Sequence, residues 1–203
     1  MTLTALVSEP AGRLVDPATH LEFLAGVEQS CEVARRLGAR NLIVVSGDAR
    51  TDVDRSEQHA AVTDALRRAA PIASAAEVGL LLEPLNTRID HKGCFLDSTR
   101  EALDIVRDVD QPALRLLYDI YHSIVMGEDT VDVLAGSGHL VGHVHIADVP
   151  GRHEPGTGAV DWPRQLAALK SVGYTRSIGL EYVPLRDTES SLEFIRGVVD
   201  DLQ

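Results

Sequence analysis

The amino-acid sequence predicts an α/β protein built on a parallel β-sheet. Short apolar runs alternate with longer segments of helical periodicity, and the runs begin about 27–38 residues apart. Most of these runs are almost continuously apolar, which is typical of strands covered on both faces rather than on one. A regular alternation of strand and helix at this spacing indicates βαβ units.

Six apolar runs are the predicted strands. In chain order they are Leu3–Val7, Asn41–Ser46, Gly79–Glu83, Leu114–Asp119, Val141–Ile146 and Ile178–Val183.

The predicted helices lie between these runs and have recognisable ends. The first begins at Asp16-Pro17, a capping residue followed by a proline, and ends at Gly38. The second covers about Arg55–Ala76, with Pro71 as a residue that can kink it or end it early. The remaining helices are a capped one from Ser98 to about Val109, a short one at Thr130–Ala135, one at Asp161–Val172 and a last one at Thr188–Leu202.

Two architectures fit this alternation: an open doubly wound sheet and a (β/α)8 barrel. The glycine-rich GxGxxG turn of a dinucleotide-binding doubly wound sheet is absent from the sequence. A complete barrel has eight strands and about 250 residues, so a barrel made by this chain would lack about two βα units. Because the first predicted strand begins at the third residue, the missing βα units are expected at the N-terminus. With no Pro-rich or Gly/Ser-rich linker, residues 1–203 are expected to form a single domain.

The charge and composition exclude several classes of function. The 203 residues carry 19 Lys and Arg against 31 Asp and Glu, a net charge of −12, which argues against binding to nucleic acid or to an anionic membrane. No apolar run approaches the roughly 20 residues of a membrane span, and the first residues lack the features of a signal peptide. Cys31 and Cys94 have no CxxC spacing and are read as ordinary thiols. We therefore expect a cytoplasmic protein.

Four residues that can bind metal ions stand at the ends of four successive predicted strands. They are Glu83, Asp119, His145 and Glu181. Three carboxylates and one imidazole suit Mg²⁺ or Mn²⁺, with Co²⁺ or Zn²⁺ as alternatives. Acidic residues at strand ends also cap helices or pair with arginine, but a shared cation best explains charges embedded in apolar runs.

Two further residues are candidates for substrate binding. His122 follows Asp119 by three residues, so its imidazole either returns over the metal or lies exposed at a helix N-terminus. Arg152 lies in the long polar loop Ala147–Asp161, where it either clamps a substrate carboxylate or is a solvated loop charge. His143 shares a strand face with His145 and is read as its neighbour or as a core residue.

These residues carry a resemblance to the hydroxypyruvate isomerase family of xylose-isomerase-like barrels. The matching stretches are EPLN at 83–86, YDIYH at 118–122, HVHIADVPGRHEPGTG at 143–158 and LEY at 180–182. The resemblance implies an α/β xylose-isomerase-like (β/α)8 TIM barrel, truncated at its N-terminus to about six βα units. It also implies one divalent metal ion, with Glu83 and Glu181 as the catalytic acid/base pair and Asp119 and His145 completing the metal shell.

The implied reaction is the isomerisation of hydroxypyruvate to tartronate semialdehyde through an enediolate. Arg152 would hold the carboxylate of this small-molecule substrate. Hydroxypyruvate isomerases often have Gln at the position of His145, whereas epimerase relatives have His, so a 2-oxo-tetronate isomerase or ketose 3-epimerase is an alternative. A non-catalytic barrel remnant is another, and the charge disfavours a nuclease-like phosphodiesterase. A shortened barrel has exposed sheet edges, so the chain is expected either to be a fragment of a longer protein or to cover those edges by other means, such as a homo-oligomer.

Overall fold

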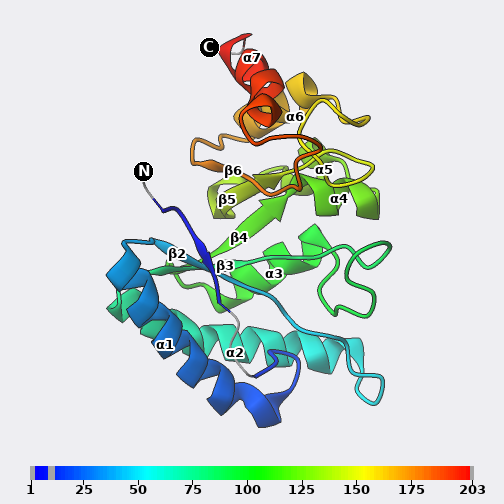
Figure 1. Cartoon of the computed structure of the whole chain (residues 1–203). Helices are drawn as coiled ribbons and strands as arrows, with labels where there is room; N and C mark the ends of the chain where they lie inside the picture. The colour runs from blue at the N-terminus through cyan, green and yellow to red at the C-terminus, as the bar shows by residue number, and fades with distance from the viewer. Residues whose placement is uncertain (1–2, 9–11, 202–203) are drawn as a thin grey trace. The chain divides into compact units, whose positions relative to one another are not determined.

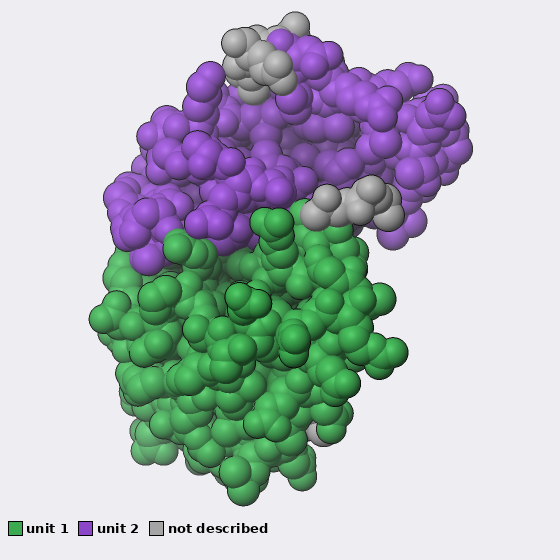
Figure 2. Space-filling model, turned by 90° about the vertical axis from the view of Figure 1, so that its left-hand side faces the viewer, with its two compact units in different colours: residues 1–117 green, residues 118–203 purple. Residues whose placement is uncertain are grey.

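The computed structural model describes residues 3–8 and 12–201 of the chain (Figure 1). They form two compact units, Met1–Leu117 and Tyr118–Gln203, which are coloured separately in Figure 2. The strands follow the order β1-β2-β3-β4-β5-β6, in which each strand neighbours the next one along the chain. A doubly wound sheet reverses its strand order at a switch point, whereas a barrel keeps it sequential. The observed order is therefore that of a barrel.

The first unit is built on the parallel strands β1 (Leu6–Val7), β2 (Asn41–Val44), β3 (Gly79–Leu82) and the start of β4 (Leu114–Asp119). In the register of β2, β3 and β4, Ile43 lies beside Leu81 and Leu82 beside Leu116. Ile43, Leu81 and Leu117 form one buried apolar cluster. This packing explains why the strands read as continuous apolar runs.

The helices of the first unit are α1 (His20–Leu37), preceded by the 3₁₀ turn Pro17–Thr19, α2 (Arg55–Ala75) and α3 (Thr99–Val109). The predicted stop at Gly38 is confirmed, since this residue has a φ of 72° after the last turn of α1. Pro71 does not end α2, which continues to Ala75. Ala69, Ala70 and Ala73 are fully buried around it, so tertiary packing offsets the hydrogen bond that proline cannot make.

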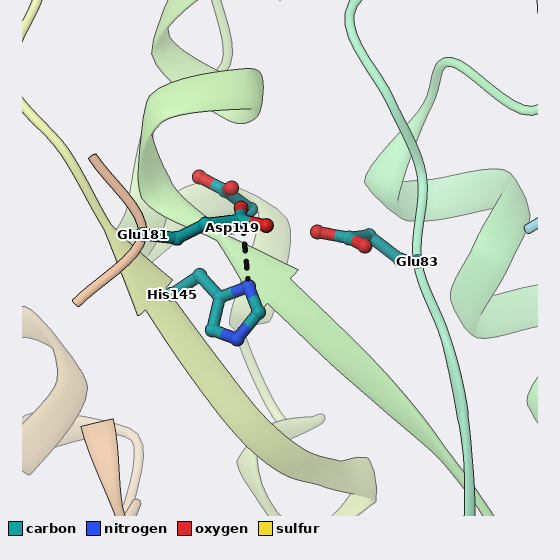
Figure 3. A group of neighbouring side chains, drawn as sticks. All are labelled: Glu83, Asp119, His145 and Glu181. Atoms are coloured by element: carbon teal, nitrogen blue, oxygen red, sulfur yellow. Dashed lines mark ion pairs between the residues drawn. The ribbon is translucent and has the colours of Figure 1, made fainter. Parts of the chain in front are cut away.

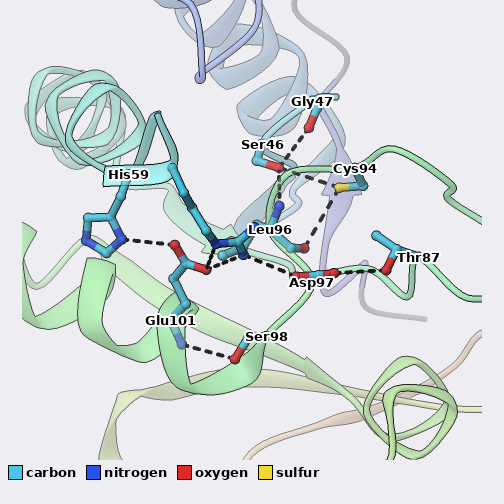
Figure 4. Close-up of polar contacts among 10 residues, drawn as sticks. Ser46, Gly47, His59, Thr87, Cys94, Leu96, Asp97, Ser98 and Glu101 are labelled. Carbon is cyan, nitrogen blue, oxygen red and sulfur yellow. Dashed lines mark hydrogen bonds and ion pairs between the residues drawn. The ribbon is translucent and has the colours of Figure 1, made fainter. Parts of the chain in front are cut away.

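Polar side chains tie the loops of the first unit to α2 and α3 (Figure 4). Arg55 donates hydrogen bonds to Glu101 and Asp97, and Nδ1 of His59 lies 3.2 Å from Oε1 of Glu101. Deeper in this group, burial raises the pKa of the Cys94 thiol above its usual range. Its sulfur is 3.5 Å from the Ser46 hydroxyl. Burial and a raised pKa are typical of structural thiols, in line with the interpretation of Cys94 as an ordinary thiol.

The second unit begins within β4 and continues through β5 (Val141–Ile146) and the parallel strand β6 (Ile178–Leu180). Its remaining elements are α4 (Ile120–Met126), α5 (Thr130–Leu134), the 3₁₀ turns Gly138–Leu140 and Ser190–Leu192, α6 (Trp162–Ser171) and α7 (Glu193–Asp201). Tyr121, Val125 and Ala147 make a buried cluster against which Tyr182 packs.

Strands β4 and β5 have the predicted bounds, and the others are shorter than predicted. The strand expected at Leu3–Val7 is reduced to Leu6–Val7, and those expected to reach Ser46, Glu83 and Val183 end at Val44, Leu82 and Leu180. The last predicted helix divides into a 3₁₀ turn and α7, and Leu202 lies outside the described residues. Within residues 3–8 and 12–201, no helix is both long and apolar enough to cross a membrane.

Candidate metal centre

Each of the four predicted metal ligands stands at the end of a strand. Asp119 is the last residue of β4, His145 is next to last in β5, and Glu83 and Glu181 directly follow β3 and β6. Each of the four offers one ligand atom, and these atoms all lie within 4.8 Å of one another (Figure 3). Glu83, Asp119 and His145 are at most 8 % exposed, and Glu181 is partly exposed.

Asp119 acts as a helix cap and also faces the ligand group. Its Oδ1 atom accepts hydrogen bonds from the backbone N–H groups of Tyr121 and His122, at 2.7 and 3.2 Å, and so caps α4. Its Oδ2 atom lies 3.6 Å from Nε2 of His122 and 3.8 Å from Nη2 of Arg152. Helix capping and metal binding are therefore compatible roles for Asp119, because Oδ1 serves the cap and Oδ2 faces the ligand group.

Glu181 lies between two basic side chains. Its Oε2 atom accepts a hydrogen bond of 2.7 Å from Nη2 of Arg152 and is 3.3 Å from Nδ1 of His145. Burial alone would raise the pKa of this carboxyl, but the contacts with His145 and Arg152 outweigh it and lower the pKa to about 2. Glu181 is therefore a carboxylate at neutral pH.

The two candidate substrate-binding residues, His122 and Arg152, lie against each other beside Asp119. Helix α4, which the sequence analysis did not predict, makes His122 its third residue and leaves it 3 % exposed. Nε2 of His122 lies 3.3 Å from Nη2 of Arg152, and the Arg152 guanidinium lies 5.1 Å from the centre of the Tyr121 ring. Neither the exposed histidine nor the solvated arginine considered for this pair is observed.

The charges of this group fit a divalent cation. Three acidic side chains stand here beside one guanidinium, that of Arg152, and one buried imidazole. Carboxylate oxygens with one imidazole nitrogen are donors that Mg²⁺, Mn²⁺, Co²⁺ and Zn²⁺ all accept. The group could therefore hold one such ion.

His143 is a buried, neutral neighbour of this group. Its ring packs edge-on against His145 with 5.0 Å between the ring centres. Burial, with a smaller contribution from the charge of His145, lowers its pKa from 6.5 to about 4.

This shift predicts a loss of stability in acid. Between pH 6.5 and about 4 the unfolded chain binds a proton at His143 that the folded chain does not, so the free energy of unfolding falls as the pH falls. The cost reaches about 3 kcal/mol at the acid end. His143→Leu is expected to remove that part of the pH dependence in urea titrations with a chelator at pH 7 and pH 4.5. An equal loss of stability in parent and variant would show that His143 titrates normally in the folded protein.

Sequence reasoning missed two residues here, Tyr121 and Asp148. Tyr121 stacks on Arg152, and only the fold of α4 brings them together. Asp148 is fully buried at the start of the loop that carries Arg152. Its position before a run of turn-forming residues indicates a role in the loop, but the sequence does not show which N–H groups donate hydrogen bonds to its carboxylate.

The fold and this group define the class of protein. The chain belongs to the xylose isomerase-like TIM barrel family, whose family model matches residues 3–198.

Among its relatives are hydroxypyruvate isomerase of Escherichia coli strain K12 and 2-oxo-tetronate isomerase of Cupriavidus necator. The first is 32 % identical over 88 % of this chain and 69 % of its own length. The second is 31 % identical over 89 % of this chain and also 69 % of its own length. A crystal structure described as AP endonuclease, family 2, from Brucella melitensis superposes with a TM-score of 0.89 at 30 % identity, covering 97 % of this chain and 78 % of that one.

Proposed function

We propose that this chain is a metal-dependent aldose–ketose isomerase that interconverts hydroxypyruvate and 2-hydroxy-3-oxopropanoate (tartronate semialdehyde). The observation that carries the proposal is the group of three carboxylates and one imidazole at the ends of four strands. Two isomerase relatives with small oxo-acid substrates support it. The net charge of −12 favours this reaction over a nuclease activity, despite the name of the Brucella structure.

Glu83, Asp119, His145 and Glu181 would hold the cation. When bound, a divalent cation polarises a carbonyl group and stabilises the negative charge that develops on the substrate oxygens. We expect Mg²⁺ or Mn²⁺, since three of the four donors are carboxylates.

Two glutamates would move the proton. One carboxylate removes a proton from C3 of hydroxypyruvate, the hydroxymethyl carbon beside the ketone, and leaves an enediolate. The other returns a proton to C2, and the hydroxyl proton on the C3 oxygen moves to the C2 oxygen. C2 thereby becomes the carbon bearing the hydroxyl group, and C3 becomes the aldehyde. Glu181 is ionised and so is available as a proton acceptor, and Glu83 is the second member of the pair.

Arg152 and His122 would bind the substrate. Arg152 is the positively charged side chain that contacts Glu181 and Asp119 in the second unit, and its planar guanidinium suits a carboxylate. His122 lies against Arg152 and Asp119, where its ring can hydrogen-bond to a substrate oxygen.

A substrate panel tests this proposal. With Mg²⁺ or Mn²⁺ present, the purified protein should turn over hydroxypyruvate faster than it turns over D-fructose, a ketose without a carboxylate. If a 2-oxo-tetronate is turned over fastest, the proposed mechanism stands and the assigned substrate changes from hydroxypyruvate to the 2-oxo-tetronate. Fastest turnover of the neutral ketose would contradict the role given to Arg152 and favour an epimerase.

Replacing Arg152 separates substrate binding from metal binding. Loss of a charged hydrogen bond to the substrate costs about 1.5–3 kcal/mol, so Arg152→Ala should raise KM for hydroxypyruvate about 10- to 100-fold. Removing a positive charge 2.7 Å from Glu181 should leave Mn²⁺ affinity equal or higher. Steady-state kinetics and titration calorimetry check the two effects. Weaker Mn²⁺ binding with an unchanged KM would show that Arg152 supports the metal group and does not hold the substrate.

A further inference from the structure

We propose that Asp148 is a positioning residue that holds Arg152 against Glu181 by closing the loop between β5 and α6. The inference rests on the proposed function, because it deepens the role given to Arg152.

The Asp148 side chain is a buried acceptor for N–H groups from along this loop. Its Oδ1 atom accepts from the backbone N–H groups of Val149 at 2.9 Å and Val160 at 3.1 Å. Its Oδ2 atom accepts from the backbone N–H of Gly156 at 2.7 Å and from the indole N–H of Trp162 at 3.1 Å. The residue is 0 % exposed, so no solvent can replace these partners. One side chain thus joins the start of the loop to its end and to α6.

The backbone of Asp148 fixes the other half of the loop. Its carbonyl oxygen accepts from the N–H of Arg152 at 3.1 Å, and its own N–H donates to the carbonyl oxygen of His153 at 2.8 Å. Within this closed turn Arg152 has a φ of 55°, in the left-handed region that non-glycine residues rarely adopt. Surrounding contacts must therefore hold that conformation, and those of Asp148 do so.

The loop is joined at the same place to the segment that follows Glu181. The carbonyl oxygen of Arg152 accepts from the N–H of Val183 at 3.1 Å. Glu154, which is 8 % exposed, accepts from the N–H of Leu185 at 2.9 Å. The backbones on either side of the Arg152–Glu181 ion pair are therefore tied to each other. A loop released by Asp148 would move Arg152 relative to Glu181.

Only a carboxylate meets the demands of this position. Burial raises the pKa of Asp148, but the hydrogen bonds from Trp162 and the loop backbone outweigh it and leave the pKa below its ordinary value. Each carboxylate oxygen of Asp148 accepts hydrogen bonds from two N–H groups. An asparagine replaces one of these oxygens with an NH₂ group, which would face two N–H donors whichever way the amide is turned. A longer glutamate would have to place an extra methylene in a site that is 0 % exposed.

Gly158 offers a second way to open the loop without changing its charge. A Cβ atom at this position would lie 2.4 Å from Oδ1 of Asp148 and 2.4 Å from the carbonyl oxygen of Val149. Gly158→Ala should therefore separate the two halves of the loop and reproduce the effect of Asp148→Asn. Asp161→Asn is the matched control, since it makes the same chemical change at an exposed residue whose capping bond to Arg164 an asparagine retains.

Trypsin measures the position of Arg152 independently of activity, because cleavage after Arg152 requires the loop to open. Each folded variant, verified by circular dichroism, is digested briefly under native conditions, and cleavage at Arg152–His153 is followed by mass spectrometry. We expect this bond to be cut about tenfold faster or more in Asp148→Asn and Gly158→Ala than in the parent or in Asp161→Asn. The single tryptophan, Trp162, should also become more accessible to acrylamide quenching in Asp148→Asn.

Kinetics then test whether Asp148 acts through Arg152. Asp148→Asn should raise KM for hydroxypyruvate about tenfold with a smaller change in kcat, and adding Arg152→Ala should give the KM of Arg152→Ala alone. A folded Asp148→Asn protein with parental cleavage at Arg152 and parental KM would overturn the inference, as would additive effects on KM. If the parent does not turn over hydroxypyruvate, the proposed function fails, and the rate of tryptic cleavage alone decides whether Asp148 holds the loop.

Discussion

Replacing Glu83 with glutamine is expected to lower kcat by about 10²–10⁴-fold, the usual contribution of general acid–base catalysis. Glutamine keeps one oxygen that can reach a cation but cannot take up or release the proton. The measurement is made at saturating Mg²⁺, because the neutral amide also weakens metal binding. Exchange of the C2 proton of 2-hydroxy-3-oxopropanoate with solvent deuterium should fall in parallel with kcat, because C2 is the carbon at which Glu83 would act.

Glu57→Gln is the matched control for this substitution. Glu57 is exposed on the first turn of α2, so the same chemical change there should leave kcat at the parental value. Exchange at the parental rate in Glu83→Gln would reduce Glu83 to a structural role and remove the two-glutamate mechanism.

Replacing Glu181 with alanine is expected to weaken Mn²⁺ binding by about 100-fold or more. Outer-shell partners of metal ligands already contribute about 10- to 100-fold to affinity, and a direct ligand should contribute at least as much. The substitution also leaves the Arg152 guanidinium without its 2.7 Å partner near Asp119, and this positive charge repels the cation. Titration calorimetry on chelator-treated protein measures the loss.

Glu189→Ala tests whether a general loss of negative charge explains the result. Glu189 is an exposed glutamate in the segment that follows Glu181, and its removal should leave Mn²⁺ affinity unchanged. Parental affinity in Glu181→Ala would exclude Glu181 from the metal shell, and equal weakening in both variants would indicate a non-specific effect of charge.

The fold was predicted well where the pattern was local. The predicted bounds of β4 and β5 match the observed ones, and the first helix ends at Gly38 as its glycine indicates. The ends of β1 and β6 were not predictable, because a strand ends where its neighbour stops pairing, and the sequence does not show the neighbour. Helix α4 was missed although Asp119 and Gly127 cap it, since seven residues are too short for a helical period to stand out.

The candidate site was predicted as a set of residues but without its contacts. The rule that parallel strands bring their C-terminal ends to one edge suffices to predict that Glu83, Asp119, His145 and Glu181 gather. The ion pair between Arg152 and Glu181 joins residues 29 positions apart through the conformation of a loop, which no periodicity encodes. Asp148 was missed for the same reason, because its partners are backbone N–H groups that the sequence does not distinguish.

Solvent exchange in the parent protein tests the central claim, a metal-dependent isomerisation, most directly. Metal-stripped protein is incubated with hydroxypyruvate in D₂O, and ¹H NMR is recorded before and after addition of Mg²⁺, with a protein-free sample subtracted as background. We expect loss of the C3 proton signal and appearance of 2-hydroxy-3-oxopropanoate after Mg²⁺ is added, and reversal of that rate increase by chelator. Exchange that proceeds equally in excess chelator, or that no divalent cation among Mg²⁺, Mn²⁺, Co²⁺ and Zn²⁺ supports, would contradict it.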